Sequence, residues 1–279
     1  MEPVDAKVAL LPALILGAAL ARGATAGPAF DPERLPNRAS WGPYQVIAEP
    51  VSGVEGARHR VRIVDGAGRP VREVRGHTLS LVAFEEVTGR PPAEVRIDVY
   101  SGGAHCCLTT YVFTRAPEVR NLFIFDAGNG GLIAIRDLDG DGRPEVEAAN
   151  DALAYLGEIP FAVSPTVALV IGWDGRRYTD RTRHFPAVAR TFAASYREEL
   201  AKTLRLSGPE AELEQRANAL GYYANLLVIG REGEARRYLD AHAPPALRGW
   251  VLGLAPQVRS RLARTPQRIT MSQRPVLGP

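Results

Sequence analysis

The chain has 279 residues, of which 46% are hydrophobic and 23% charged, and its formal net charge at pH 7 is +3. This size and composition exclude a chain without a hydrophobic core and leave room for one large or two smaller domains. A sequence pI near 9.0, due mostly to arginine, suits contact with anionic polymers but is too common to select such a partner. We expect no nucleic-acid partner.

The N-terminal segment predicts export. An apolar run from Val8 to Ala21 is followed by Ala24 and Ala26, the small residues of a cleavage signature before Gly27. The run of about 14 residues is shorter than the roughly 20 that a membrane-spanning helix needs. Acidic residues ahead of it are untypical of such a segment. We predict a signal peptide over residues 1–26, a periplasmic or secreted mature chain, and no transmembrane segment in that mature chain.

From about Trp41 to Thr182 the pattern is that of strands. Segments such as HRVRIV (59–64) and VALVIGW (167–173) are rich in β-branched residues, and Asp-Gly pairs supply the turns of hairpins. We therefore predict a mainly antiparallel β domain over residues 27–185. Arg58, Arg60 and Arg62 would share one face of a strand, either as a solvated face or as an anion-binding stripe.

Beyond Phe185, Ala, Leu, Glu and Arg recur at helical spacing. Gly208 is suited to end one helix, Pro209 to open the next, and Pro244-Pro245 to separate two later ones. We predict three or four short helices that form a small α-helical domain over residues 186–264, followed by a disordered tail over 265–279. The fold class is then α+β.

One internal repeat stands out. LVAFEEVTGRPPAEV (81–95) aligns with LIAIRDLDGDGRPEV (132–146) at an offset of about 51 residues. In each copy a strand runs into an acidic, glycine-containing loop and out into a strand that begins at Glu-Val. The first copy has Glu86, Thr88 and Arg90 where the second has Asp137, Asp139 and Asp141. The second loop therefore keeps its acidic residues, and the first is degenerate.

The second loop predicts a metal ion, because five acidic residues between Arg136 and Glu147 would otherwise only repel one another. Ca²⁺ prefers carboxylate and carbonyl oxygens, and Gly140 and Gly142 allow the tight turns that wrap a chain around a cation. An EF-hand is excluded, because Ala148 stands where its closing Glu belongs and no helical pattern flanks the loop. The alternative is a solvated acidic turn without metal.

The segment DLDGDGRPEV (137–146) resembles the calcium loop of FG-GAP and VCBS repeats, the strand-loop-strand units of integrin alpha propellers and of many secreted bacterial proteins. The resemblance covers about 100 residues in two units. A propeller needs typically four to eight blades, so we expect a smaller domain of propeller-blade-like units, as a sandwich or an incomplete blade pair. The ligands that the resemblance implies are the side chains of Asp137, Asp139 and Asp141, the backbone carbonyl of Arg143, and the closing carboxylate of Glu145.

Both cysteines of the chain, Cys106 and Cys107, are neighbours that follow His105 directly. Thiols tend to pair in an oxidising compartment, although adjacent Cα atoms, about 3.8 Å apart, are closer than in an ordinary disulfide. We predict a vicinal disulfide between them. Two separately buried thiols, a His-Cys metal site, and a catalytic cysteine with His105 as its base remain as alternatives.

These features predict a calcium-stabilised binding or interaction module of the bacterial envelope or exterior. Its partner would be a protein or an envelope polysaccharide that the sequence does not identify, and its oligomeric state is not indicated. The alternative is a thiol- or metal-dependent enzyme centred on His105, Cys106 and Cys107. We favour the role without catalysis, because no third residue that would orient a catalytic Cys-His pair is evident.

Overall fold

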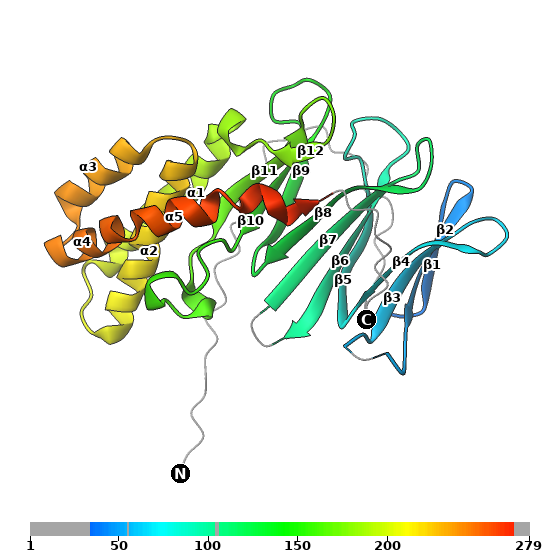
Figure 1. Ribbon diagram of the computed structural model, residues 1–279, viewed down its shortest axis with the longest axis horizontal. Helices are drawn as coiled ribbons and strands as arrows, with labels where there is room; N and C mark the ends of the chain where they lie inside the picture. The colour runs from blue at the N-terminus through cyan, green and yellow to red at the C-terminus, as the bar shows by residue number, and fades with distance from the viewer. Residues whose placement is uncertain (1–33, 55, 104–105, 271–279) are drawn as a thin grey trace, which may run out of the picture.

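The part of the chain that the structure describes forms three antiparallel sheets followed by five helices, which confirms the predicted α+β class. The computed structural model describes residues 34–54, 56–103 and 106–270. Figure 1 shows the sheets in a row with the helices gathered at one end. Within the described residues, no helix is both long enough and apolar enough to cross a membrane. The predicted signal peptide, residues 1–26, lies outside them.

Each sheet is built from four strands that follow one another in the chain, the arrangement from which propeller blades are made. The first sheet contains β1 (Asn37–Trp41), β2 (Tyr44–Pro50), β3 (His59–Val64) and β4 (Pro70–Gly76). The second contains β5 (Thr78–Glu85), β6 (Glu94–Gly103), β7 (Cys106–Thr114) and β8 (Arg120–Gly128), with β13 (Ile269–Thr270) added beside β8. The third contains β9 (Gly131–Arg136), β10 (Glu145–Asn150), β11 (Val167–Trp173) and β12 (Tyr178–Asp180).

Three of the helices begin where the sequence indicates: directly after Phe185, at Pro209 and at Pro245. The helices are α1 (Pro186–Thr203), α2 (Pro209–Val228), α3 (Glu232–His242), α4 (Pro245–Gly253) and α5 (Ala255–Leu262). Four short 3-10 helices join the larger elements: η1 (Leu156–Glu158), η2 (Phe161–Val163), η3 (Thr182–His184) and η4 (Thr265–Arg268). Pro209 and Pro245 each stand in the first turn of a helix, where a missing N–H costs nothing. The last predicted helix is divided in two at Leu254, just before Pro256.

The buried residues form a series of cores between successive layers. One core, which includes Val61 and Ile97, lies between the first and second sheets, and another, which includes Phe123 and Leu169, lies between the second and third. The third sheet then packs against the helices through Ala168 and its neighbours. The third sheet is therefore covered by a sheet on one side and by helices on the other, which accounts for the unbroken apolar run of β11.

Asn225 joins the helices to this sheet. Its side chain is fully buried on α2. Its oxygen accepts the N–H of Ala168 at 2.9 Å, while its amide nitrogen donates to the carbonyls of Thr166 and Gly221 at 3.2 and 2.9 Å. A buried amide with this many partners fixes where α2 sits on β11.

The chain after Arg264 corrects the predicted disordered tail. Residues 265–268 form η4, and Ile269 and Thr270 pair with Phe125 and Ile124 of β8. This segment has no periodicity, because it gains its order by adding to the edge of a distant strand rather than from its own pattern. The rest of the predicted tail, residues 271–279, lies outside the described residues. β8 itself was not predicted as a separate strand.

Candidate metal centre

Both halves of the internal repeat adopt the predicted strand-loop-strand form. β5 and β6 flank the first loop, and β9 and β10 flank the second. The registers are equivalent, since Glu85 pairs with Glu94 in the first copy and Arg136 with Glu145 in the second. The alignment made on sequence therefore corresponds to a structural duplication.

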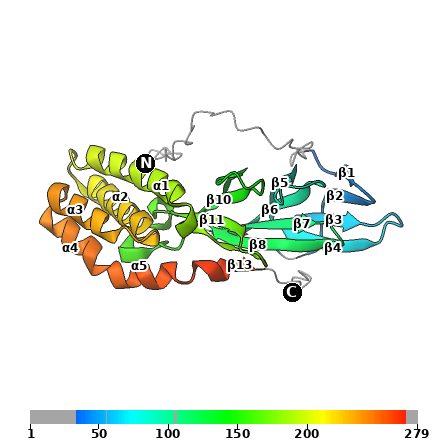
Figure 2. The same ribbon diagram turned by 90° about the horizontal axis from the view of Figure 1, so that it is seen from above.

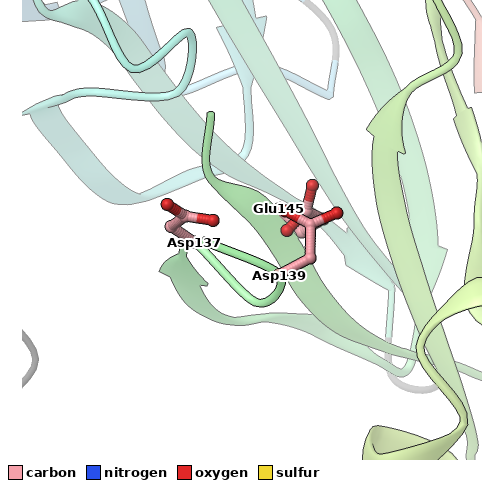
Figure 3. A group of neighbouring side chains, drawn as sticks. All are labelled: Asp137, Asp139 and Glu145. Carbon is pink, nitrogen blue, oxygen red and sulfur yellow. The ribbon is translucent and has the colours of Figure 1, made fainter. Parts of the chain in front are cut away.

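The second loop gathers carboxylates as expected. Ligand oxygens of Asp137, Asp139 and Glu145 all lie within 4.8 Å of one another. Figure 3 shows the three side chains on the β9–β10 loop and at the start of β10. Two oxygens bound to one Ca²⁺ at 2.3–2.6 Å are at most about 5.2 Å apart, so this spacing fits a shared calcium ion. These three residues form an acidic group suited to a metal.

Glycines and side-chain turns give the loop its shape. The two carboxylate oxygens of Asp137 accept the N–H groups of Gly140 and Gly142 at 2.7 and 2.8 Å. Asp139 accepts the N–H of Asp141. Gly140 and Gly142 have φ angles of 81° and 84°, in the left-handed region that favours glycine. These bonds curl the backbone and still leave each carboxylate lone pairs for a cation.

Of the predicted carboxylate ligands, Asp141 lies outside this group, while the backbone carbonyl of Arg143 stays a prediction. Asp141 is exposed, and its carboxylate accepts the N–H of Arg143 at 2.7 Å. The guanidinium of Arg143 lies over the ring of Trp173, 5.1 Å from its centre. The acidic group that the described residues bring together is therefore narrower than the set that the repeat resemblance implies.

Glu145 and Asp137 differ in how readily they ionise. Glu145 is buried at 5% exposure, and this burial, with the nearby charges of Asp139, Asp141 and Asp137, raises its pKa. The N–H of Leu138 partly offsets the rise by donating to the Glu145 carboxylate at 3.0 Å. For Asp137, the N–H of Gly142 is the main cause of a lowered pKa. A divalent cation would favour the ionised form of both groups.

The first copy keeps the closing acid and has Glu86 at the place of Asp137, but Thr88 stands at the place of Asp139. Glu94 stands where Glu145 stands in the second copy, is buried at 1% exposure, and accepts the N–H groups of Val87 and Thr88 at 2.9 and 3.2 Å. The Thr88 hydroxyl, in the place of Asp139, therefore donates a hydrogen bond to the buried Glu94. A carboxylate at the same position would repel Glu94 unless a cation lay between the two groups. Glu94 was missed as a site residue, although the aligned Glu-Val pairs indicate it.

The two loops lie against each other. Gly89 of the first loop approaches Gly142 of the second so closely that a Cβ atom at position 89 would overlap the Gly142 carbonyl oxygen. The hydroxyl of Tyr178, on β12, donates to the carbonyl of Val87 at 3.0 Å. The buried Val87 side chain enters the core between the second and third sheets. The first loop therefore packs directly against the second, acidic loop and supports its backbone.

The other predicted sites have different outcomes. His105 and the side chain of Cys106 lie outside the described residues, so the bond between Cys106 and Cys107 stays a prediction. Arg60 and Arg62 both bind the carboxylate of Glu49, at 2.7 and 2.8 Å, which favours an ion-paired solvated face over an anion-binding stripe.

Comparison of the chain with protein-family models, with curated proteins and with solved structures finds no match.

Proposed function

We propose that this chain is an exported binding or interaction module of the bacterial envelope or exterior, held rigid by one Ca²⁺ ion. The observation that carries the proposal is the group of oxygens from Asp137, Asp139 and Glu145 within 4.8 Å of one another. Export is supported by the apolar run and the small residues that follow it at the N-terminus. The predicted disulfide between Cys106 and Cys107 belongs to the same proposal, since it requires an oxidising compartment.

Bound Ca²⁺ would supply positive charge at the centre of the loop. Asp137 and Asp139 would offer oxygens from the loop itself, and Glu145 would close the site from β10. Since Glu145 starts a strand of the third sheet and Asp137 directly follows another, the ion would tie β9 to β10 at the end where the two loops touch. Its role is structural: it favours the folded arrangement of carboxylates that otherwise repel.

Calcium should raise the melting temperature of the protein. At a free concentration about tenfold above the dissociation constant, a bound ion adds on the order of 1.4 kcal/mol to the free energy of unfolding, which corresponds to a shift of a few degrees. Asp139→Ala should abolish most of this shift, measured by differential scanning calorimetry with calcium and with chelator. Calorimetric titration should show uptake of one ion.

The matched control is Thr88→Ala, at the equivalent position of the first copy. It removes the hydroxyl bond to Glu94 and should lower the melting temperature with and without calcium by the same amount. A melting temperature of the unaltered protein that ignores both calcium and chelator, together with no calcium uptake, would return the loop to a solvated acidic turn.

A further inference from the structure

A cavity lies where the end of the helical part meets the edge of the second sheet. Its volume is about 540 Å³, within the range of small-molecule sites. Figure 2 shows α5 leading toward β13, which lies beside β8. The polar side chains that line it come from β8, from the last turn of α5 and from the segment after it: Asp126, Arg261, Arg264, Gln267, Arg268 and Thr270.

The three arginines differ in what neutralises them. Arg268 is paired with the carboxylate of Asp151. Arg261 donates to the backbone carbonyls of Ala152 and Ala154 at 3.3 and 2.6 Å, which position its guanidinium without cancelling its charge. Arg264 is exposed, and no acidic partner for its side chain occurs in the part of the chain that the structure describes. The cavity therefore offers positive charge to a ligand.

An aromatic pair follows Ala154, whose carbonyl accepts a hydrogen bond from Arg261. Tyr155 follows Ala154 directly, is 56% exposed, and stacks on Phe161 with ring centres 5.4 Å apart. The backbone here is unusual, because Tyr155, Gly157 and Glu158 have φ angles of 59°, 66° and 64°. The hydroxyl of Ser164 accepts the Tyr155 N–H at 3.0 Å. Non-glycine residues held in the left-handed region cost energy and concentrate at functional sites.

We propose that this cavity and the Tyr155–Phe161 pair bind an acidic oligosaccharide. Arg264 and Arg261 would pair with its carboxylates, while Gln267, Thr270 and Asp126 would bond its hydroxyls. The aromatic pair would lie against the apolar face of a sugar ring. A DNA phosphate backbone offers no hydroxyl donor to the Asp126 carboxylate, which favours a sugar over a DNA ligand. The inference names the surface and ligand class of the binding role proposed above and rests on that role.

The direct test is calorimetric titration of the full chain with β-1,4-linked triglucuronate. Cellotriose, in which hydroxymethyl groups replace the carboxylates, is the neutral control. We expect triglucuronate to bind and cellotriose to bind at least about tenfold more weakly, since charge-assisted hydrogen bonds to the arginines are lost. Equal affinity for the two sugars would overturn the inference. Tighter binding of a short DNA duplex, or equal binding of inorganic phosphate, would overturn it as well.

Four variants test which residues bind. Arg264→Ala should weaken triglucuronate binding about tenfold, while Arg205→Ala, an exposed arginine that does not line the cavity, should leave it unchanged. Tyr155→Asn removes the ring but tolerates the left-handed backbone, and should also weaken binding. Tyr155→Phe keeps the ring and should bind normally. Unchanged affinity in both Arg264→Ala and Tyr155→Asn would contradict the assignment.

The same samples separate this inference from the calcium proposal. Melting curves with calcium and with chelator are recorded for each variant alongside the titrations. A calcium-dependent melting shift without triglucuronate binding would refute the sugar site and leave the calcium site standing. Triglucuronate binding without any effect of calcium on melting would refute the calcium site and leave the sugar site standing.

Discussion

Glu94 and Glu145 occupy equivalent positions in the two copies of the repeat but meet different surroundings. Glu94 is satisfied by two backbone N–H groups and the Thr88 hydroxyl, whereas Glu145 faces the carboxylates of Asp137 and Asp139. The first buried acid is therefore stabilised mainly by hydrogen-bond donors, whereas the second is stabilised by a proton or by a cation that offsets its acidic neighbours. Glutamate at the equivalent position of the two copies is thus a hydrogen-bonded core residue in the first copy and part of the acidic group in the second.

Glu94 makes stability depend on pH. Burial raises the pKa of this carboxyl above the ordinary 4.5, because the N–H bonds from Val87 and Thr88 only partly offset desolvation. The folded state then holds the proton more tightly than the unfolded state, so stability gains as the pH falls through the folded pKa toward 4.5 and is lost again as the pH rises.

Glu94→Gln should remove this dependence. We expect the variant to gain stability relative to the unaltered protein at pH 7, and this advantage to shrink as the pH falls toward 4.5, the ordinary value for the carboxyl. Urea unfolding at a series of pH values measures the difference. A difference between the two proteins that stays constant with pH would contradict the role of burial. The calcium response of the variant should be unchanged.

Gly89 tests the contact between the two loops. Gly89→Ala places a Cβ atom against the carbonyl of Gly142 and should cost about 3 kcal/mol of unfolding free energy. Gly53→Ala is the matched control, since Gly53 has a similar φ of 75° with nothing near its Cβ position, and should cost about 1 kcal/mol. Equal losses in chemical denaturation would mean that the loops can separate freely.

At the scale of elements, the two copies hold their strands together with opposite charges. Arg96 of β6 lies 3.5 Å from Glu85 of β5, and in the second copy Glu147 of β10 pairs with Arg136 of β9. In the aligned repeat Glu85 corresponds to Arg136, and Arg96 corresponds to Glu147. The acidic and basic residues have therefore exchanged positions between the two copies, and each copy keeps an attractive pair. Such an inversion favours pairing of each strand with its own neighbour, because mispairing would oppose like charges.

The junction of α2 with β11 should be sensitive to one residue. Asn225→Ala leaves the buried N–H of Ala168 and the carbonyl of Thr166 without their partner, and we expect a loss of about 2–3 kcal/mol in unfolding free energy. Asn218→Ala, in the same helix, controls for helix propensity and should change little. Chemical denaturation measures both. A small effect at Asn225 would mean that packing alone positions the helix.

For the molecule as a whole, the third sheet is the layer that connects the others. It shares one core with the second sheet and another with the helices. Its loop also carries the acidic group. Binding of an ion at that loop should therefore affect the stability of the helices through the third sheet, although no helix residue belongs to the acidic group.

Calcium should consequently stabilise the sheets and helices together. We expect the ion to raise the melting midpoint measured by helical ellipticity at 222 nm, and hydrogen exchange of β9–β10 peptides to slow in parallel. The physical reason is that unfolding of the helices exposes the buried face of β11. Two separate transitions, of which calcium moves only that of the sheets, would show that the layers unfold independently.

What the sequence alone determined is local. Segments rich in β-branched residues predict β3 and β11 to the residue, and Pro209 marks the start of α2. The aligned repeat predicts two loops, of which the second is the more acidic. These features follow from neighbouring residues, whose backbone preferences and alternation act over a few positions. They were sufficient for the α+β class and for locating the acidic group.

Only the tertiary structure decided which distant parts meet. No local pattern indicates that residues 269–270 pair with β8, that Gly89 touches Gly142, or that Asn225 bonds the backbone of β11. It also decided that Asp139 joins Asp137 and Glu145, while the Asp141 carboxylate accepts the N–H of Arg143. The physical reason is that these contacts depend on how sheets and helices stack around shared cores, and stacking is set by the whole chain rather than by any segment of it.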